Sequence, residues 1–328
     1  MTVGSYISVI ITAHDRKKYI LDAVSSVLKQ KLDRSRYEII VVKNFRDEKI
    51  DSFLDDAGIT KNFLTQERGV GKKAAIGVEN ASGDIICFLD DDDMFAEDKL
   101  SVVLDTFSSV EGLVYYHNNQ IKIDEEGNII EVPKVNGKDI ISDINERAIV
   151  HIFRNFGEFN QSSICVRKDV LDVGVMKRLD RAIDYFYLMS ALKSRGKIFL
   201  DYTPLTYYRI HESTMHFISS SPQKVIEKAC NYYSEQAEAK RIIHDYLKDD
   251  QLLERFARED YYVFSAIASI LCGKSKALPL KYSLKVLNNP IYFPSFRVKL
   301  LLASIINLFS NKLAKEMYAK MYMRRYGV

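Results

Sequence analysis

Short apolar runs and amphipathic stretches alternate along the first hundred residues. The runs are rich in β-branched residues, as in buried strands, and the stretches between them repeat apolar residues every three or four positions, as on one helix face. The strand-like runs span 7–12, 37–43, 62–66 and 84–89, and the helix-like segments span 17–30, 47–56, 71–81 and 96–107. The strand-like runs are apolar on both faces, which favours parallel strands with crossover helices. The sequence therefore predicts an α/β fold with a mostly parallel sheet and flanking helices.

The pattern changes after about residue 110. Two strand-like runs flank the turn-forming letters DEEGN within 113–132, which predicts a hairpin. From there to residue 211 the pattern predicts, in order, a loop region at 133–160, a strand at 162–167, a helix at 183–196 and strands at 197–211. The signal is helical from residue 216 onward. We therefore expect a sheet-containing domain over 1–215 and a helical region over 216–328.

Charge differs between these two regions. The chain carries a net charge of +3, but residues 216–328 have 18 Lys and Arg against 10 Asp and Glu. Within 294–328 the basic residues alternate with Leu, Ile, Phe, Met and Tyr at near-helical spacing. Such a segment can lie on an anionic membrane surface, or its apolar face can pack on the protein or on a second subunit. No nucleic-acid-binding module accompanies it, so we expect no nucleic-acid partner.

The expected compartment is the cytoplasm. No apolar run approaches the roughly 20 residues of a membrane span. The first strand-like run begins without a preceding signal-like pattern, so we expect no secretory signal. Cys87, Cys165, Cys230 and Cys272 are far apart and form no C-x-x-C pair, which predicts four reduced thiols. Contact with a membrane would then be peripheral, on its cytoplasmic face.

Four consecutive aspartates, Asp90 to Asp93, end the apolar run at 84–89. Ligands of open α/β sheets bind at the carboxyl ends of the strands. Because side chains alternate along a strand, Asp90 and Asp92 should point together and Asp91 elsewhere. Clustered carboxylates repel one another, and their oxygens suit Mg²⁺ or Mn²⁺. The alternative is an acidic loop in which Asp93 or a neighbour caps the next helix.

The strings YISVIITAHDR, YEIIVV and RGVGKKAAIGVENASGDIICFLDDDDMFAEDKL carry a resemblance to a known family. They resemble the nucleotide-binding half of the family 2 glycosyltransferases, which have the GT-A fold, and the similarity continues more loosely to about residue 215. The resemblance implies an inverting enzyme that moves a sugar from a nucleotide-sugar donor to an acceptor hydroxyl with Mn²⁺ or Mg²⁺. It also divides the domain into a nucleotide-binding half, 1–100, and an acceptor half, 101–215.

The resemblance also implies roles for single residues. Asp90 and Asp92 match the family's D-x-D pair, with Asp92 on the metal, Asp90 near the donor ribose and on the metal, and Asp93 in support. Asp184, in RAIDYFYLMSALKSRGKI, matches the family's general base, which must accept the proton of the acceptor hydroxyl; Asp180 is the fallback. The remaining donor-binding candidates are Ala13, His14, Asp15, Asn44, Lys72, Lys73, Asp91 and Arg209, and His211 is a third candidate metal ligand.

Several positions depart from the family pattern. Lys43 and Asn44 replace the Asp pair that reads uracil in the family, so the base of the nucleotide stays open. Ala74 and Ala75 stand where the family has Arg and Asn, and Ile183 replaces a glutamate before the base. The basic tail suggests a glycan or lipid-linked acceptor near a membrane. Two alternatives remain: a catalytically silent nucleotide- or glycan-binding module, and a sugar nucleotidyltransferase.

Overall fold

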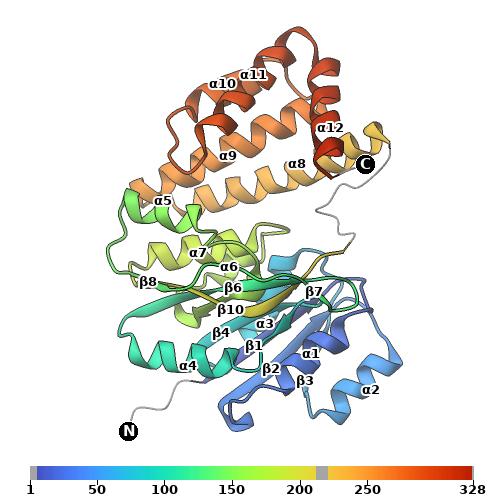
Figure 1. Ribbon diagram of the computed structural model, residues 1–328, viewed down its shortest axis with the longest axis vertical. Helices are drawn as coiled ribbons and strands as arrows, with labels where there is room; N and C mark the ends of the chain where they lie inside the picture. Colours follow the sequence, from blue (N-terminus) through green and yellow to red (C-terminus); the bar gives the residue numbers. More distant parts are fainter. Residues whose placement is uncertain (1–5, 212–220, 327–328) are drawn as a thin grey trace. The chain divides into compact units, whose positions relative to one another are not determined.

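The computed structural model of the protein describes residues 6–211 and 221–326, with side chains up to residue 323 (Figure 1). The chain divides into two compact units, Met1–His211 and Glu212–Val328, and each is described by itself. The expected boundary after residue 215 lies outside the described residues. So do the side chains of Arg324 and Arg325 in the basic tail.

The first unit is built on four parallel strands. Strands β1 (Ile7–Ala13), β2 (Tyr37–Lys43), β3 (Lys61–Leu64) and β4 (Ile85–Asp90) lie in the order β3-β2-β1-β4. Each neighbouring pair is parallel, as their doubly apolar patterns predict. Every residue of β1 is buried, because helices cover both faces of the sheet.

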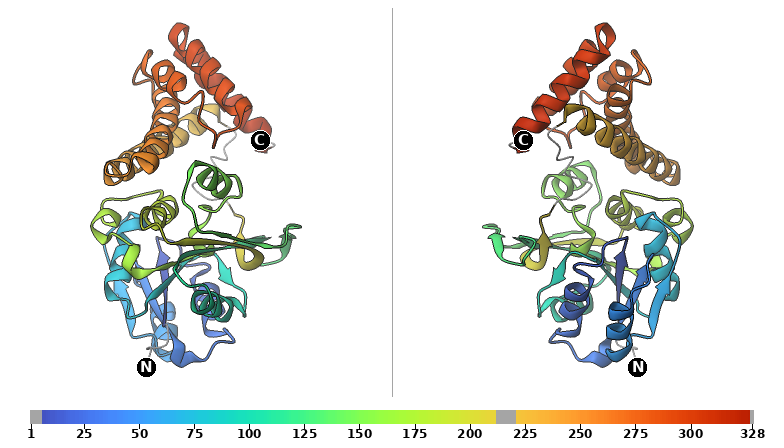
Figure 2. Two further views of the ribbon diagram at one scale, coloured as in Figure 1. Left: turned by 90° about the vertical axis from the view of Figure 1, so that its left-hand side faces the viewer. Right: turned by 90° about the vertical axis from the view of Figure 1, so that its right-hand side faces the viewer.

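The covering helices divide between the two faces of the sheet (Figure 2). Helices α1 (Ile20–Leu28), α2 (Glu48–Asp56) and α4 (Lys99–Ser109) share one apolar cluster with alternate residues of β1 and β4. On the other face lie α3 (Val70–Asn80) and α7 (Ile183–Lys193). Gly77 of α3 abuts Ile10, and Tyr187 of α7 stacks on Phe88 at 3.9 Å.

Beyond β4 the sheet becomes mixed. It continues in the order β9 (Ile164–Arg167), β6 (Leu113–Ile123), β10 (Lys197–Arg209) and β5 (Met94–Phe95), for ten strands in all among the described residues. Strand β9 is antiparallel to both β4 and β6, whereas β10 is parallel to β6. Strand β7 (Ile129–Glu131) pairs antiparallel with β6, which confirms the predicted hairpin. Short helices complete the unit at η1 (Arg34–Arg36), η3 (Lys168–Val170) and α6 (Val173–Met176).

The prediction of a loop over 133–160 is wrong. This segment contains β8 (Lys138–Ile141), which pairs with β10, and α5 (Glu146–Arg154). Helix α5 begins where the Asn145 side chain accepts a hydrogen bond from the Ala148 amide, and it buries Ile149, Ile152 and Phe153. The buried residues of α5 do recur at helical spacing, but the helix has only nine residues and β8 only four, so each pattern is short.

The second unit is helical, as predicted. It consists of α8 (Pro222–Tyr246), α9 (Gln251–Cys272), α10 (Leu278–Lys285), α11 (Pro294–Phe309) and α12 (Asn311–Tyr326). Lys240 of α8 bonds Asp260 of α9 at 2.9 Å in a buried ion pair. Across the described residues, none of the helices has the length and apolar character needed to cross a bilayer.

The prediction of four reduced thiols is wrong for two of them. Cys230 of α8 and Cys272 of α9 form a disulfide, whereas Cys87 and Cys165 are free and buried. The pair is 42 residues apart and meets only because α8 and α9 pack side by side, so spacing alone could not reveal it. Cysteine usage therefore no longer supports a reducing compartment.

Candidate functional site

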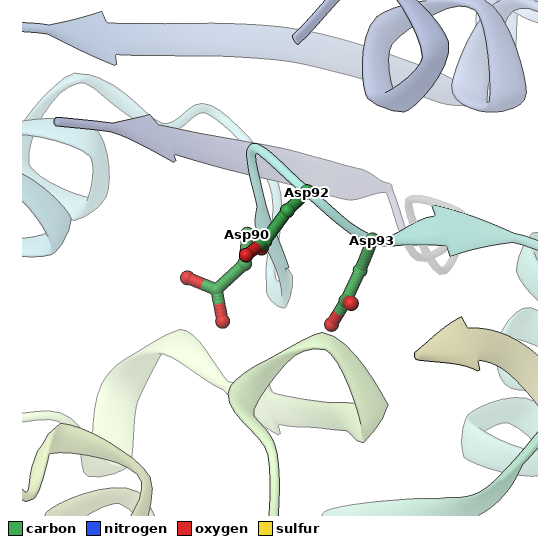
Figure 3. Close-up of side chains that lie close together, drawn as sticks. All are labelled: Asp90, Asp92 and Asp93. Carbon is green, nitrogen blue, oxygen red and sulfur yellow. The ribbon is translucent and has the colours of Figure 1, made fainter. Parts of the chain in front are cut away.

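The aspartates gather where β4 ends. The chain turns after Asp90, with the Asp93 amide donating to the Asp90 carbonyl at 3.3 Å. One carboxylate oxygen from each of Asp90, Asp92 and Asp93 lies within 4.8 Å of the others (Figure 3). Asp90 and Asp92 converge as expected, although a turn rather than strand alternation brings them together. Asp93 joins them and does not cap α4, whose N-cap residue is Asp98 without a side-chain bond.

A short polar segment before β9 holds two of these carboxylates. Gln161 donates a hydrogen bond to Asp90, and Asn160 donates to Asp93 at 3.0 Å. The hydroxyl of Ser162 accepts from the Asp90 amide at 3.0 Å. These three residues belong to η2 (Gln161–Ser163) and its N-cap, where Asn160 has the left-handed φ of 64° that asparagine tolerates. The segment that precedes β9 therefore orients these aspartates.

A guanidinium group lies directly on the cluster. Arg16 bonds Asp91 Oδ1 at 2.7 Å and Asp92 Oδ2 at 2.6 Å. His211 Nε2 also approaches Asp92 Oδ2, at 2.7 Å. Asp91 is not among the three carboxylates that converge, and its second oxygen is buried without a hydrogen-bond partner among the described residues. Arg16 supplies part of the positive charge that the four carboxylates need.

The four carboxyl groups have displaced pKa values. Burial raises the pKa of Asp90 well above its usual range, and the charges of Asp92 and Asp93 add to the effect. Burial, with the charge of Asp92, raises the pKa of Asp93 to about 7. Burial raises the pKa of Asp91 to about 6, although Arg16 opposes it. Burial acts on Asp92 too, but its bond to His211 and the Arg16 charge hold its pKa below the usual value.

Arg209 contacts the turn that carries the aspartates. It is only 4% exposed, and its guanidinium donates to the carbonyls of Asp92 and Glu125 at 2.9 and 2.8 Å and to Asp22 Oδ2 at 3.2 Å. Its backbone amide donates to Asp93 Oδ1 at 3.0 Å. The structure therefore places Arg209 at the cluster, but with its side chain directed at protein atoms.

The ends of β1 and β2 form the other side of the site. Asp15 has a left-handed φ of 57°, and its amide and carboxylate exchange two hydrogen bonds of 2.8 Å with the Asn44 side chain. Ala13 ends β1 opposite Lys43 in the ladder. Lys43 does not face the strand ends: its buried ammonium bonds Asp51 of α2 at 2.7 Å. Lys43, which replaces one Asp of the family's pair, thus links β2 to α2 through this ion pair.

The two lysines of α3 take different places. Lys73 is 2% exposed, donates to the Arg68 carbonyl at 2.8 Å and lies 3.3 Å from His14 Nδ1. Burial lowers the pKa of Lys73, while the charge of Asp91 opposes the shift, so the ammonium is within electrostatic reach of the cluster. Burial and Lys73 also lower the pKa of His14. Lys72 instead pairs with Asp180 at 3.3 Å, away from the carboxylates.

The two candidate bases differ in their surroundings. Asp184 lies in the first turn of α7, where its Oδ1 accepts from the Tyr185 amide at 2.8 Å. Burial raises the pKa of Tyr208 above its usual range, and the negative charges of Asp93, Asp92, Asp90 and Asp184 all add to that shift. Asp184 therefore lies within electrostatic reach of the same ring as the aspartate cluster. Asp180 has an exposed side chain that is paired with Lys72.

Sequence reasoning missed the residues that hold the aspartates. Arg16 directly follows Asp15 in the string AHDR, at the carboxyl end of the first strand, and that position could have indicated it. Asn160 and Gln161 precede a buried strand, and both are almost fully buried. Their side chains reach the cluster only because β9 pairs with β4, and nothing in the local pattern predicts that pairing.

A parallel sheet with helices on both faces, and carboxylates at the end of its central strand, defines a GT-A-type α/β domain. Residues 8–162 match the family model described as glycosyl transferase family 2. This match within the sheet-containing unit confirms the resemblance seen in the sequence.

Two sequence relatives are named glycosyltransferases. An uncharacterized glycosyltransferase of Rickettsia conorii is 31% identical over 127 residues, and one of Rickettsia felis is 30% identical over 127 residues. Each match covers 38% of this chain and only 21% of the relative. The chain therefore spans about a fifth of the length of these relatives.

Solved structures of S. aureus TarS are similar in fold. One superposes with a TM-score of 0.61 at 16% identity, covering 95% of this chain and 55% of that one. TarS 1–349 in complex with UDP-GlcNAc gives a TM-score of 0.56 at 17% identity, covering 96% of this chain and 92% of that one. At this level of identity the likeness shows the fold alone.

Proposed function

We propose that the chain is a metal-dependent, inverting glycosyltransferase that uses a nucleotide-sugar donor. The observation that carries the proposal is the meeting of Asp90, Asp92 and Asp93 at the carboxyl end of the central strand of a family 2 domain. The charges of Asp184 and of these carboxylates both raise the pKa of Tyr208, which supports Asp184 as the base of the same site.

The cluster fits a divalent cation. It offers three hard oxygen ligands, and the repulsion that contributes to the raised pKa values of Asp90 and Asp93 supports a compensating cation. We assign Asp90 and Asp92 as the principal ligands, with Asp93 in support and His211 beside Asp92 as a further candidate. Mg²⁺ or Mn²⁺ bound here would offset the negative charge of the donor diphosphate as a Lewis acid.

Sugar transfer then requires one protein base. The acceptor hydroxyl attacks the anomeric carbon as the bond from that carbon to the diphosphate oxygen breaks, and its proton passes to the Asp184 carboxylate. In-line attack inverts the anomeric configuration. Lys73 and His14, near Asp91, supply positive charge and a hydrogen-bonding group beside the diphosphate.

The nucleoside contacts the ends of β1 and β2 in this proposal. Ala13, Asp15 and Asn44 form that surface, and the Asp15–Asn44 pair fixes the amide that would read the base. TarS structures hold UDP-GlcNAc and UDP, so uridine nucleotides come first among the candidates. Because Lys43 stands where the family has an Asp that reads uracil, donors with other bases are tested as well.

The acceptor in this proposal is a glycan or a lipid-linked sugar at the cytoplasmic face of a membrane. This part rests on the basic character of the helical region and is separate from the donor chemistry.

Calorimetric binding tests the proposal. UDP-, GDP-, CMP- and TDP-sugars are titrated into the full chain with and without Mn²⁺. We expect one nucleotide series to bind only when the metal is present, and to release a free nucleoside diphosphate when acceptors are supplied. Metal-independent binding without turnover would favour a catalytically silent binding module. Release of pyrophosphate from a nucleoside triphosphate and a sugar phosphate would favour a sugar nucleotidyltransferase.

Arg16→Gln should strengthen metal binding to the aspartate cluster. The Arg16 guanidinium holds Asp91 and Asp92 and therefore competes with a cation for Asp92. Removing it should lower the dissociation constant for Mn²⁺ by about tenfold, since one unit charge is withdrawn from a partly buried site. Manganese titration followed by calorimetry and by the melting temperature measures this, with the exposed Arg46→Gln as the control. Weaker metal binding in Arg16→Gln would mean that Arg16 orients the carboxylates instead.

A further inference from the structure

Helix α11 packs on the helical unit through a mixed face, in which Leu300 and Phe296 join an apolar cluster beside buried polar residues. The residues it buries are Leu300, Ser304 and Asn307, which recur at helical spacing. Ser304 bonds Ser283 of α10 at 2.6 Å, and Asn307 donates to the carbonyls of Ser275 and Lys276 at 3.2 and 3.1 Å. Polar bonds therefore fix the inner face of α11 to the rest of the helical unit.

The opposite face of α11 is apolar and exposed. Val298, Leu302, Ile305 and Phe309 recur at spacings of four, three and four residues, which is one stripe of a helix. They are 51%, 53%, 37% and 83% exposed. We call these four residues the apolar stripe. A contiguous exposed row of this kind is unusual in a soluble protein and indicates an interaction surface.

Helix α12 repeats the arrangement with basic residues beside it. Its exposed apolar residues are Leu313, Met317 and Met321, at 49%, 49% and 57% exposure and at four-residue spacing. Lys299 on α11 and Lys312 and Lys320 on α12 are also exposed. From residue 274 to the end of the sequence there are 11 Lys and Arg and a single acid, Glu316.

We propose that the apolar stripe and the exposed face of α12 bind an anionic lipid surface. The apolar side chains would enter the boundary between headgroups and acyl chains, and the three lysines would contact the headgroups. A second copy of the chain is a poorer occupant, because it would bring the same excess of positive charge against this one. The proposal concerns the helical unit and stands whether or not the donor proposal holds.

Vesicle flotation of the full chain tests the apolar part. The chain should float with vesicles of phosphatidylcholine mixed with phosphatidylglycerol and remain unbound with phosphatidylcholine alone. Leu302→Ser combined with Phe309→Ser should weaken partition by about tenfold or more, since both side chains would leave the apolar phase. Phe156→Ser is the matched control, because Phe156 is 67% exposed in the sheet-containing unit. Unchanged flotation of the double variant would overturn the proposal.

Charge reversal tests the electrostatic part. Lys299→Glu, Lys312→Glu and Lys320→Glu should each weaken flotation by about fivefold, because one basic residue near an anionic surface is worth a factor of that order. Lys49→Glu on α2 should leave flotation unchanged.

Sedimentation of the same proteins distinguishes a lipid surface from a second copy of the chain. If the wild type bound no lipid and formed an oligomer that became monomeric in the Leu302→Ser, Phe309→Ser variant, the face would be assigned to a second copy. Donor binding by these variants should match wild type, so loss of flotation cannot be confused with loss of the transferase site.

Discussion

Asp92→Asn should abolish the metal-dependent part of donor binding and lower turnover by about 10²- to 10³-fold. Asp92 is the carboxylate of the cluster whose pKa is held below its usual value, so it carries a full negative charge at neutral pH. Asparagine keeps the shape of the side chain but removes that charge. The measurement is calorimetric titration of donor and Mn²⁺ together, followed by the turnover number at saturating metal.

The control for this change is Asp56→Asn, on the exposed surface of α2. Its donor binding and turnover should equal those of wild type. Asp92→Asn should keep the wild-type melting temperature without metal, because removing one of several clustered carboxylates also removes repulsion. Full metal-dependent binding by Asp92→Asn would show that the cation, if any, lies elsewhere.

The elements of residues 1–100 were predictable because their signals are local. Strands β1, β2 and β4 have largely apolar runs, and the helices between them show a clear period. Four charges directly after a buried strand can be explained only by a ligand or a loop, and the place of that strand end in an α/β sheet follows from a general rule. The aspartates could therefore be placed without a structure.

The rest of the site depends on distant contacts. Gln161 reaches Asp90 only because β9 pairs with β4, and Arg209 reaches the aspartate turn from the end of β10. Lys43 reads as a lost ligand in the sequence, but the structure pairs it with Asp51, a residue of the helix that follows. Patterns along the chain do not contain these partnerships, because each one joins side chains that tertiary packing brings together.

The same limit explains the two errors, one at 133–160 and one in the helical region. Strand β8 is stabilised by pairing with β10, and α5 by three buried side chains whose helical spacing extends over only nine residues. The Cys230–Cys272 disulfide joins helices whose register is set by the whole α8–α9 interface, including the Lys240–Asp260 pair. In both cases the deciding contacts are non-local.

Asp184→Asn should lower the turnover number by about 10²- to 10⁴-fold while donor affinity changes little. The amide cannot accept the acceptor proton, yet it can still accept the hydrogen bond of the Tyr185 amide, so the start of α7 should remain intact. Single-turnover transfer with saturating donor and metal measures the effect. The loss should be confined to transfer, because Asp184 takes no part in holding the cation or the diphosphate in this mechanism.

Asp180→Asn is the matched comparison. Asp180 lies in the same segment, but its side chain is exposed and pairs with Lys72, so its replacement should change turnover by less than about threefold. A large loss in Asp180→Asn with normal turnover in Asp184→Asn would exchange the two assignments. Both variants could instead turn over normally while Asp92→Asn was inactive. The acceptor proton would then pass to water or to another group of the acceptor, and neither aspartate would be the base. The role of α7 would be to pack on the sheet through Tyr187 and Phe88.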